Sequence, residues 1–213
     1  MWRGVREWFW RVQLEKTAEA LRANGFTAHV ALDREEARRI VLGLIPEGST
    51  VGVGGSVTIR ELGLIDELER RGYRVIHHWV KAPPEEVDRL RRLELTADVF
   101  LCSANAVTLD GKLVNVDGVG NRVAAMIFGP RRVIVVAGRN KLVRDVGEGL
   151  WRAKNVAAIM NWRRLGLDNP CVKLGRCVDC DSPTRGCNVV VILERRPLRT
   201  DVHVVLVNEE LGF

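Results

Sequence analysis

Apolar positions along the first two-thirds of the chain recur with two alternating periods. Residues 6–23 carry apolar side chains at helical spacing and end at Asn24-Gly25, a helix stop signal. Asp33 and Glu36 form a capping box that opens a helix through Leu44. The same patterns predict further helices over 58–71, 84–95, 121–128 and 143–154, and strands over 26–32, 50–53, 73–79, 97–103, 133–137, 189–193 and 202–207.

The order of these segments predicts the fold class. Repeated strand–helix–strand units are typical of an α/β fold whose mostly parallel sheet has helices on both faces. Residues 106–116 differ, because Asp110-Gly111 between apolar runs predicts a hairpin. Beyond Asn161 the periodicity is lost until the last two strands. We therefore expect one domain over residues 1–213, with a polar cysteine-rich metal-binding segment at 168–188.

Composition and charge narrow the classes of partner. Of the 213 residues, 46% are apolar and 28% charged, and the net charge is +6. The basic residues are spread along the chain, which predicts solvated faces and anionic small molecules rather than nucleic acid. No run approaches the ~18 to 20 apolar residues of a membrane span, and no secretory signal is recognisable. We expect a cytoplasmic protein, and the sequence leaves homo-oligomer formation open.

The first candidate binding site is the turn that follows the strand at 50–53. Gly54, Gly55 and Ser56 lie between that strand and a helix, where glycine lets the backbone approach a ligand. Val57 stands where a dinucleotide fingerprint has its third glycine, and the Lys-Ser/Thr pair of a P-loop is missing. The turn therefore predicts an anion site, and a plain strand–helix connection is the equal alternative.

The second candidate site is the polar loop 115–122, which should meet the first at the carboxyl ends of the strands. Asp117 is expected to act as a base or to orient a substrate hydroxyl, and Arg122 to pair with a carboxylate or phosphate. Asn115 and Asn121 flank them, and Asn105 follows the strand at 97–103. We interpret these three amides as ligand-binding residues. The alternative is that Asp117 serves only the turn and Arg122 a surface ion pair.

Four of the five cysteines cluster near the end of the chain. Cys171, Cys177, Cys180 and Cys187 have the spacing C-x5-C-x2-C-x6-C, enough thiolates for one zinc ion or one iron–sulfur cluster. A zinc ribbon usually has two C-x2-C knuckles, whereas this run has one, so iron–sulfur is preferred and zinc remains the alternative. Cys102 lies among apolar residues and is expected to be an inert buried thiol.

Three longer segments resemble the LUD-domain family, named for lactate utilisation: VGVGGSVTIRELGL, ADVFLCSANAVT and DGKLVNVDGVGNRVAAMIFGPRRVIVVAGRNKLV. The resemblance runs from about Leu14 to Phe213 and is closest to small single-domain members with a cysteine-rich C-terminal stretch. It implies a fold similar to the isomerase and CoA-transferase-like superfamily. It also implies a setting among proteins that oxidise L-lactate to pyruvate with iron–sulfur carriers.

The leading expectation is a LUD-type protein that binds an iron–sulfur cluster, of the 4Fe-4S type, through its four clustered cysteines. It would take part in electron transfer during redox metabolism of a small carboxylate such as L-lactate. One alternative is a transferase or isomerase acting on a phosphorylated or CoA-linked substrate, with structural zinc. Another is a non-catalytic subunit that docks to an oxidoreductase partner through the aromatic N-terminus around Trp8 and Trp10.

Overall fold

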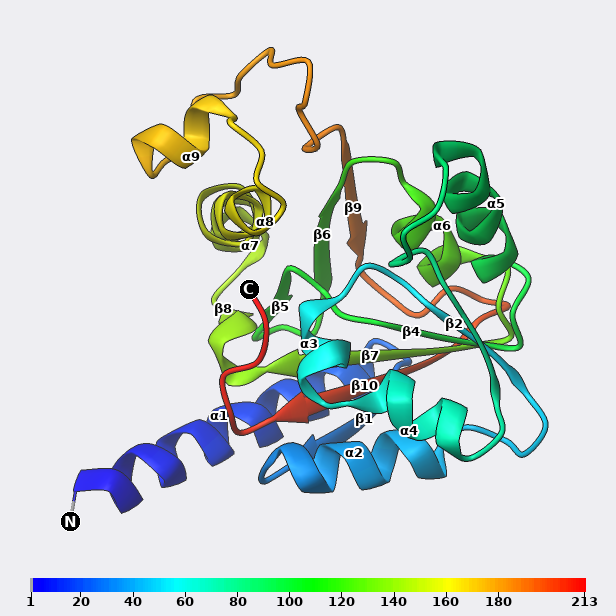
Figure 1. Ribbon diagram of the computed structural model, residues 1–213. Coiled ribbons are helices and arrows are strands. Elements are labelled where there is room, and N and C mark those ends of the chain that lie inside the picture. The colour runs from blue at the N-terminus through cyan, green and yellow to red at the C-terminus, as the bar shows by residue number, and fades with distance from the viewer. Residues whose placement is uncertain (1) are drawn as a thin grey trace.

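A computed structural model describes residues 2–213, and its centre is a six-stranded parallel sheet (Figure 1). Every neighbouring pair of strands in this sheet runs parallel. The mostly parallel α/β fold expected from the sequence is thus confirmed. In spatial order the strands are β1 (Thr27–Ala31), β10 (Asp201–Val207), β7 (Arg132–Gly138), β4 (Val99–Cys102), β2 (Thr50–Val53) and β3 (Arg74–His77).

A second, four-stranded sheet packs on one face of the first. The hairpin expected around Asp110-Gly111 is present and forms its middle. Because β9 pairs with this hairpin while β10 joins the large sheet, the last two strands belong to different sheets. In spatial order the strands are β8 (Leu142–Val143), β5 (Ala106–Thr108), β6 (Leu113–Asp117) and β9 (Val189–Leu193).

Helices cover both faces of the large sheet. On one face lie α2 (Arg34–Gly43), α3 (Val57–Glu61) and α4 (Leu64–Arg70), and on the other α1 (Trp2–Ala23), α6 (Asn121–Ile127) and the second sheet. Helix α5 (Pro84–Glu94) packs on β2 and β3.

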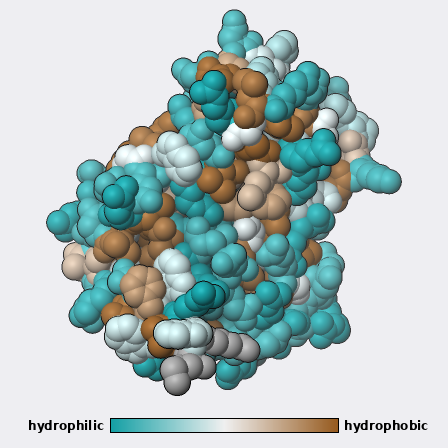
Figure 2. Space-filling view, turned by 90° about the vertical axis from the view of Figure 1, so that its left-hand side faces the viewer, coloured by the Kyte–Doolittle hydropathy of each residue, from teal (hydrophilic) through white to brown (hydrophobic). Residues whose placement is uncertain are grey.

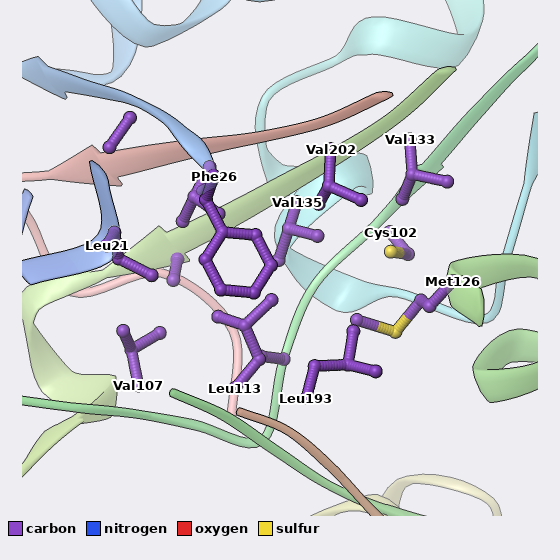
Figure 3. Packing of buried hydrophobic residues seen from close by; sticks show 14 of the residues in the cluster. Leu21, Phe26, Cys102, Val107, Leu113, Met126, Val133, Val135, Leu193 and Val202 are labelled. Carbon is purple, nitrogen blue, oxygen red and sulfur yellow. The ribbon is translucent and has the colours of Figure 1, made fainter. Parts of the chain in front are cut away.

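The alternation of side chains along β7 supplies both cores. Val133 and Val135 pack toward the second sheet, where Leu113 and Leu193 meet them (Figure 3), and Ile134 packs on the opposite face. Successive strand residues point to opposite faces, so one apolar strand fills two cores.

Some helices differ from the sequence prediction. The helix expected over 58–71 is two helices, because Gly63 takes a left-handed φ of 61° between α3 and α4. The helix expected over 143–154 runs further, as α7 (Val146–Arg152), a π-helical turn (Ala153–Ala157) and α8 (Ala158–Arg164). A short helix, α9 (Pro170–Leu174), opens the cysteine segment, where no helix was expected. That segment lies at the edge of the molecule away from α2 and α4 (Figure 1).

The face of the molecule shown in Figure 2 is mostly hydrophilic, with scattered hydrophobic patches. Among residues 2–213, no helix combines the length and the apolar character that crossing a bilayer requires.

The hairpin turn packs so closely on α1 that position 111 requires glycine. Gly111 has a φ of 81°, and a Cβ there would lie 2.5 Å from the backbone carbon of Ala20 in α1. We predict that Gly111→Ala lowers the free energy of unfolding by about 3 kcal/mol, from left-handed strain plus overpacking. Gly48→Ala is the control, because Gly48 has a φ of 75° but open space around it. Urea unfolding should give the control a loss of only about 1 kcal/mol, and equal losses for both would contradict the contact argument.

Candidate functional site

A polar cleft of about 180 Å³ opens at one edge of the large sheet. Strands β2, β4 and β7 are neighbours and parallel, so their carboxyl ends lie together there. The segments that leave these ends, Gly55–Thr58, Ser103–Asn105 and Lys141, all line the cleft. The carboxyl edge of such a sheet is where ligands of open α/β folds bind.

The cleft brings together most of the residues that the sequence singled out. Gly55, Ser56, Asn105, Asp117 and Arg122 line it, so the glycine turn and the 115–122 loop do meet.

Three other candidates lie outside the cleft lining. Gly54 is behind it, where a Cβ would lie 2.9 Å from the ring of Phe100. Asn115 is fully buried, and Asn121 lines a neighbouring groove and donates to Glu94. Asn115 and Gly54 therefore support the wall of the site from within.

Arg122 holds the loops of the cleft together. Its Nη1 donates to the carbonyl oxygen of Ser103 (3.0 Å) and to Oδ1 of Asn115 (2.6 Å). Its Nη2 donates to Oδ1 of Asn105 (3.2 Å) and to the carbonyl oxygen of Val116 (2.9 Å). Since four of its five N–H groups are used by the chain, its geometry favours positioning the loops over direct pairing with a ligand.

The carboxylate of Asp117 lies beside Nε, the remaining nitrogen of the Arg122 guanidinium. Its Oδ2 lies 3.2 Å from Nε of Arg122, and its Oδ1 accepts from the backbone N–H of Gly120. Both side chains of the ion pair are 11% exposed. Oδ2 is buried and makes no aligned hydrogen bond within the described chain, so the ion pair with Arg122 holds it, while the residue as a whole lines the cleft.

Lys141, which no sequence motif marks, provides the cation of the cleft that has no carboxylate partner in the described chain. It is 3% exposed, and its Nζ donates to the hydroxyls of Thr58 and Ser103, at 2.9 Å each. No carboxylate in residues 2–213 forms an ion pair with it. Burial, and then the charges of Arg152 and Arg122, lower the pKa of Lys141 to about 7. The sequence does offer one indication of Lys141. It follows the strand at 133–137, whose carboxyl end lies at the same sheet edge as the other candidate residues.

The four clustered cysteines line one small cavity of about 20 Å³. Cys171 is buried in α9, and the other three are partly exposed. Burial is the main cause that raises the pKa of Cys171 and of Cys187, and neighbouring thiols add to it in both. As placed, no three Cys, His, Asp or Glu side chains among residues 2–213 form a ready metal-ligand set. The donor types suit zinc or iron–sulfur, and ligation would require the four thiols to come closer together than they lie here.

Polar side chains fix the backbone of the cysteine segment. Oδ1 of Asn155, in the π-helical turn, accepts from the N–H of Cys177 at 2.8 Å. Asn169 is 1% exposed and binds Thr184. The N–H of Asp179 lies 3.5 Å from Sγ of Cys177, a contact that stabilises sulfur as a ligand.

Two cations lie beside the same cavity. Lys154 and Arg185 line it, and Arg185 donates to the carbonyl oxygen of Cys180 at 2.6 Å. A centre with four thiolate ligands carries net negative charge, which such cations would offset.

The cleft and the cysteine cavity share a wall. Trp162, Gly186 and Cys187 line both of them. The wall is closely packed, because a Cβ on Gly186 would lie 2.3 Å from the ring of Trp162. A ligand in the cleft and a centre on the cysteines would thus be neighbours.

Comparison with known proteins identifies the family. A family model described as the LUD domain matches residues 14–207. The chain belongs to the LUD-domain family, which is associated with lactate utilisation. No protein among those with curated descriptions gives a significant match.

A solved structure has a similar fold. It is the crystal structure of a DUF162 family protein from Deinococcus radiodurans, 18% identical, with a TM-score of 0.54 over 93% of this chain and 98% of that one. At that identity the likeness concerns the fold alone.

The lowered pKa of Lys141 predicts a pH-dependent stability. Between its folded pKa of about 7 and an unfolded value near 10.4, the unfolded chain binds the extra proton. The contribution of Lys141 to the free energy of unfolding therefore rises with pH across this window and falls as the pH drops toward 7. Relative to Lys141→Met, the wild type should gain up to about 1.4 kcal/mol per pH unit between pH 7 and 10.

Urea unfolding at several pH values measures this difference. Lys173→Met, which removes an exposed lysine, is the control and should follow the wild-type pH profile. Parallel pH profiles for wild type and Lys141→Met would contradict the prediction, because the charge on the buried amine would then not destabilise the folded state.

Proposed function

We propose that the cleft binds a small anionic metabolite, a carboxylate such as L-lactate, and that the four cysteines hold an iron–sulfur cluster of the 4Fe-4S type. The cluster would serve as an electron carrier in the redox metabolism of that metabolite. The observation that carries this proposal is the wall of Trp162, Gly186 and Cys187 between the two sites. A shared wall makes functional sense when electrons have to pass between them.

The cleft offers separate groups for each part of a hydroxy acid. The ammonium group of Lys141 has no carboxylate partner in the described chain, so it would pair with the carboxylate of the ligand. The carboxylate of Asp117, which lines the cleft and is held in orientation by Arg122, would accept the proton of the ligand hydroxyl.

The cysteine segment would hold the cluster through Cys171, Cys177, Cys180 and Cys187. When bound, an iron–sulfur cluster supplies a site that accepts and passes on single electrons. The N–H group of Asp179 next to a sulfur would tune such a centre, and Lys154 with Arg185 would balance its charge. Structural zinc on the same thiolates is the alternative, and metal analysis separates the two.

A protein that carries electrons through a cluster needs a partner protein that delivers or accepts them. The docking surface for such a partner would be the aromatic N-terminus around Trp8 and Trp10. Trp8 is 56% exposed and Trp10 half-buried, and Trp2 and Phe9 of the same helix are exposed beside them. A purely docking subunit would bind the partner but no metabolite. Self-association of the chain stays a prediction as well.

Metal analysis tests the cysteine centre. We predict that anaerobically purified protein contains iron and acid-labile sulfide, with visible absorbance that Cys177→Ser together with Cys180→Ser abolishes. Cys102→Ala is the control, because Cys102 is buried in the core among apolar side chains (Figure 3) and lines neither site. Stoichiometric zinc without colour would replace the redox role with a structural one.

Calorimetric titration with L-lactate tests the cleft. Lys141→Met should weaken binding at least tenfold, because the ligand carboxylate loses its cation. For the wild type, affinity should fall as the pH rises above 7, since the amine of the free protein then loses its proton. Binding that is indifferent to Lys141→Met and to pH would place the carboxylate elsewhere.

A further inference from the structure

A second hollow of about 480 Å³ adjoins the cleft. Six residues line both: Gly55, Asp117, Gly118, Arg122, Asn161 and Trp162. We call this hollow the arginine groove, because Arg60, Arg91 and Arg164 line its remaining wall together with His78 and Trp79. One extended ligand can therefore have groups in the cleft and in the groove at once.

Two guanidinium groups of the groove meet at one aromatic ring. The guanidinium carbon of Arg60 lies 4.0 Å from the ring centre of Trp79, and that of Arg164 lies 5.0 Å from it. The three residues come from α3, from the segment after β3 and from the end of α8. Cation–π contact with Trp79 holds these like charges close together.

The carboxylate that lines the groove, Asp117, and the one directly behind His78 and Asn121, Glu94, are already paired. Asp117 pairs with Arg122, and Glu94 is 1% exposed, with His78 and Asn121 bound to it at 2.6 and 3.2 Å. Among the described residues that line the groove, Asp117 is the one carboxylate, so Arg60 and Arg164 have no carboxylate partner there.

The arginines themselves keep unused donors. The side chain of Arg164 donates only to the amide oxygen of Asn161, and the guanidinium of Arg60 makes no hydrogen bond or ion pair within residues 2–213. Arg91 pairs with Asp88 through Nη1, but its buried Nε has no partner in the described chain. A buried donor without an acceptor is costly, and an anion in the groove would supply acceptors.

We propose that the arginine groove is a phosphate subsite, so that the ligand of this site carries a phosphate group as well as the carboxylate that Lys141 meets. The planar forks of arginine match the oxygens of a phosphate, and several guanidinium groups around one hollow suit a dianion better than a single carboxylate. The proposal deepens the proposed function and rests on it for the carboxylate end. The substrate class is a phosphorylated hydroxy acid.

Calorimetric titration of the full chain with inorganic phosphate tests the subsite alone. We expect Arg164→Gln combined with Arg60→Gln to weaken phosphate binding at least tenfold. Arg163→Gln is the control, because Arg163 lies in the last turn of the same helix and is exposed but does not line the groove. Circular dichroism of each variant verifies the fold. Absent phosphate binding, or equal loss in control and double variant, would overturn the proposal.

Two organic probes separate this inference from the proposed function. We expect 3-phosphoglycerate to bind at least tenfold more tightly than L-lactate, and to lose affinity both in Lys141→Met and in the Arg60→Gln/Arg164→Gln variant. If lactate binding depends on Lys141 while 3-phosphoglycerate gains nothing from the arginines, the phosphate subsite fails and the proposed function stands. If phosphate binding needs the arginines but neither organic probe needs Lys141, the subsite stands and the carboxylate site fails.

Discussion

The guanidinium of Arg122 is the interaction on which the rest of the site depends. Its hydrogen bonds tie the ends of β4 and β6 to the start of α6, through carbonyl groups and the amides of Asn105 and Asn115. The guanidinium is largely buried, and its four Nη hydrogen bonds and its ion pair with Asp117 hold these loops together. Removing one partner of such a buried network typically costs about 3–5 kcal/mol, because the remaining polar groups stay uncompensated.

This arrangement decides which charges are left for chemistry. Since Arg122 is used by the chain, Lys141 is the cation that remains for a ligand in the cleft, and the groove arginines form a second positive region beside it. The cysteine segment is held in a different way. Between α9 and β9 it has no helix or strand, and Asn155, Asn169 and Arg185 fix its backbone. A segment held by polar contacts gains stability when a metal joins its thiolates.

Periodicity predicted most of the fold and part of the site. The strands, the Asp33 cap and the hairpin at Asp110-Gly111 were predictable because each depends on local pattern. The meeting of the glycine turn with the 115–122 loop followed from the rule that carboxyl ends of parallel strands share one edge. The same rule, applied to strand 133–137, would have found Lys141.

Other features depend on contacts that no local pattern encodes. The hydrogen bonds of Arg122 require acceptors from two separate segments, 103–105 and 115–117. The second sheet requires β9 to pair with β6 and not with a strand of the large sheet. The shared wall depends on Trp162 packing against Gly186, which lie 24 positions apart in the sequence. Which residues the cleft shares with the groove and with the cysteine cavity could therefore be learned only from the structure.

The central claim is that the cleft and the cysteine centre act as one unit across that wall. The most direct test is the visible absorption spectrum of anaerobically purified protein during titration with L-lactate, with binding followed in parallel by calorimetry. The account predicts a spectral change that saturates with the calorimetric binding curve and is lost in Lys141→Met. Binding that leaves the spectrum of the centre unchanged would contradict it, because the two sites would then be neighbours without being coupled.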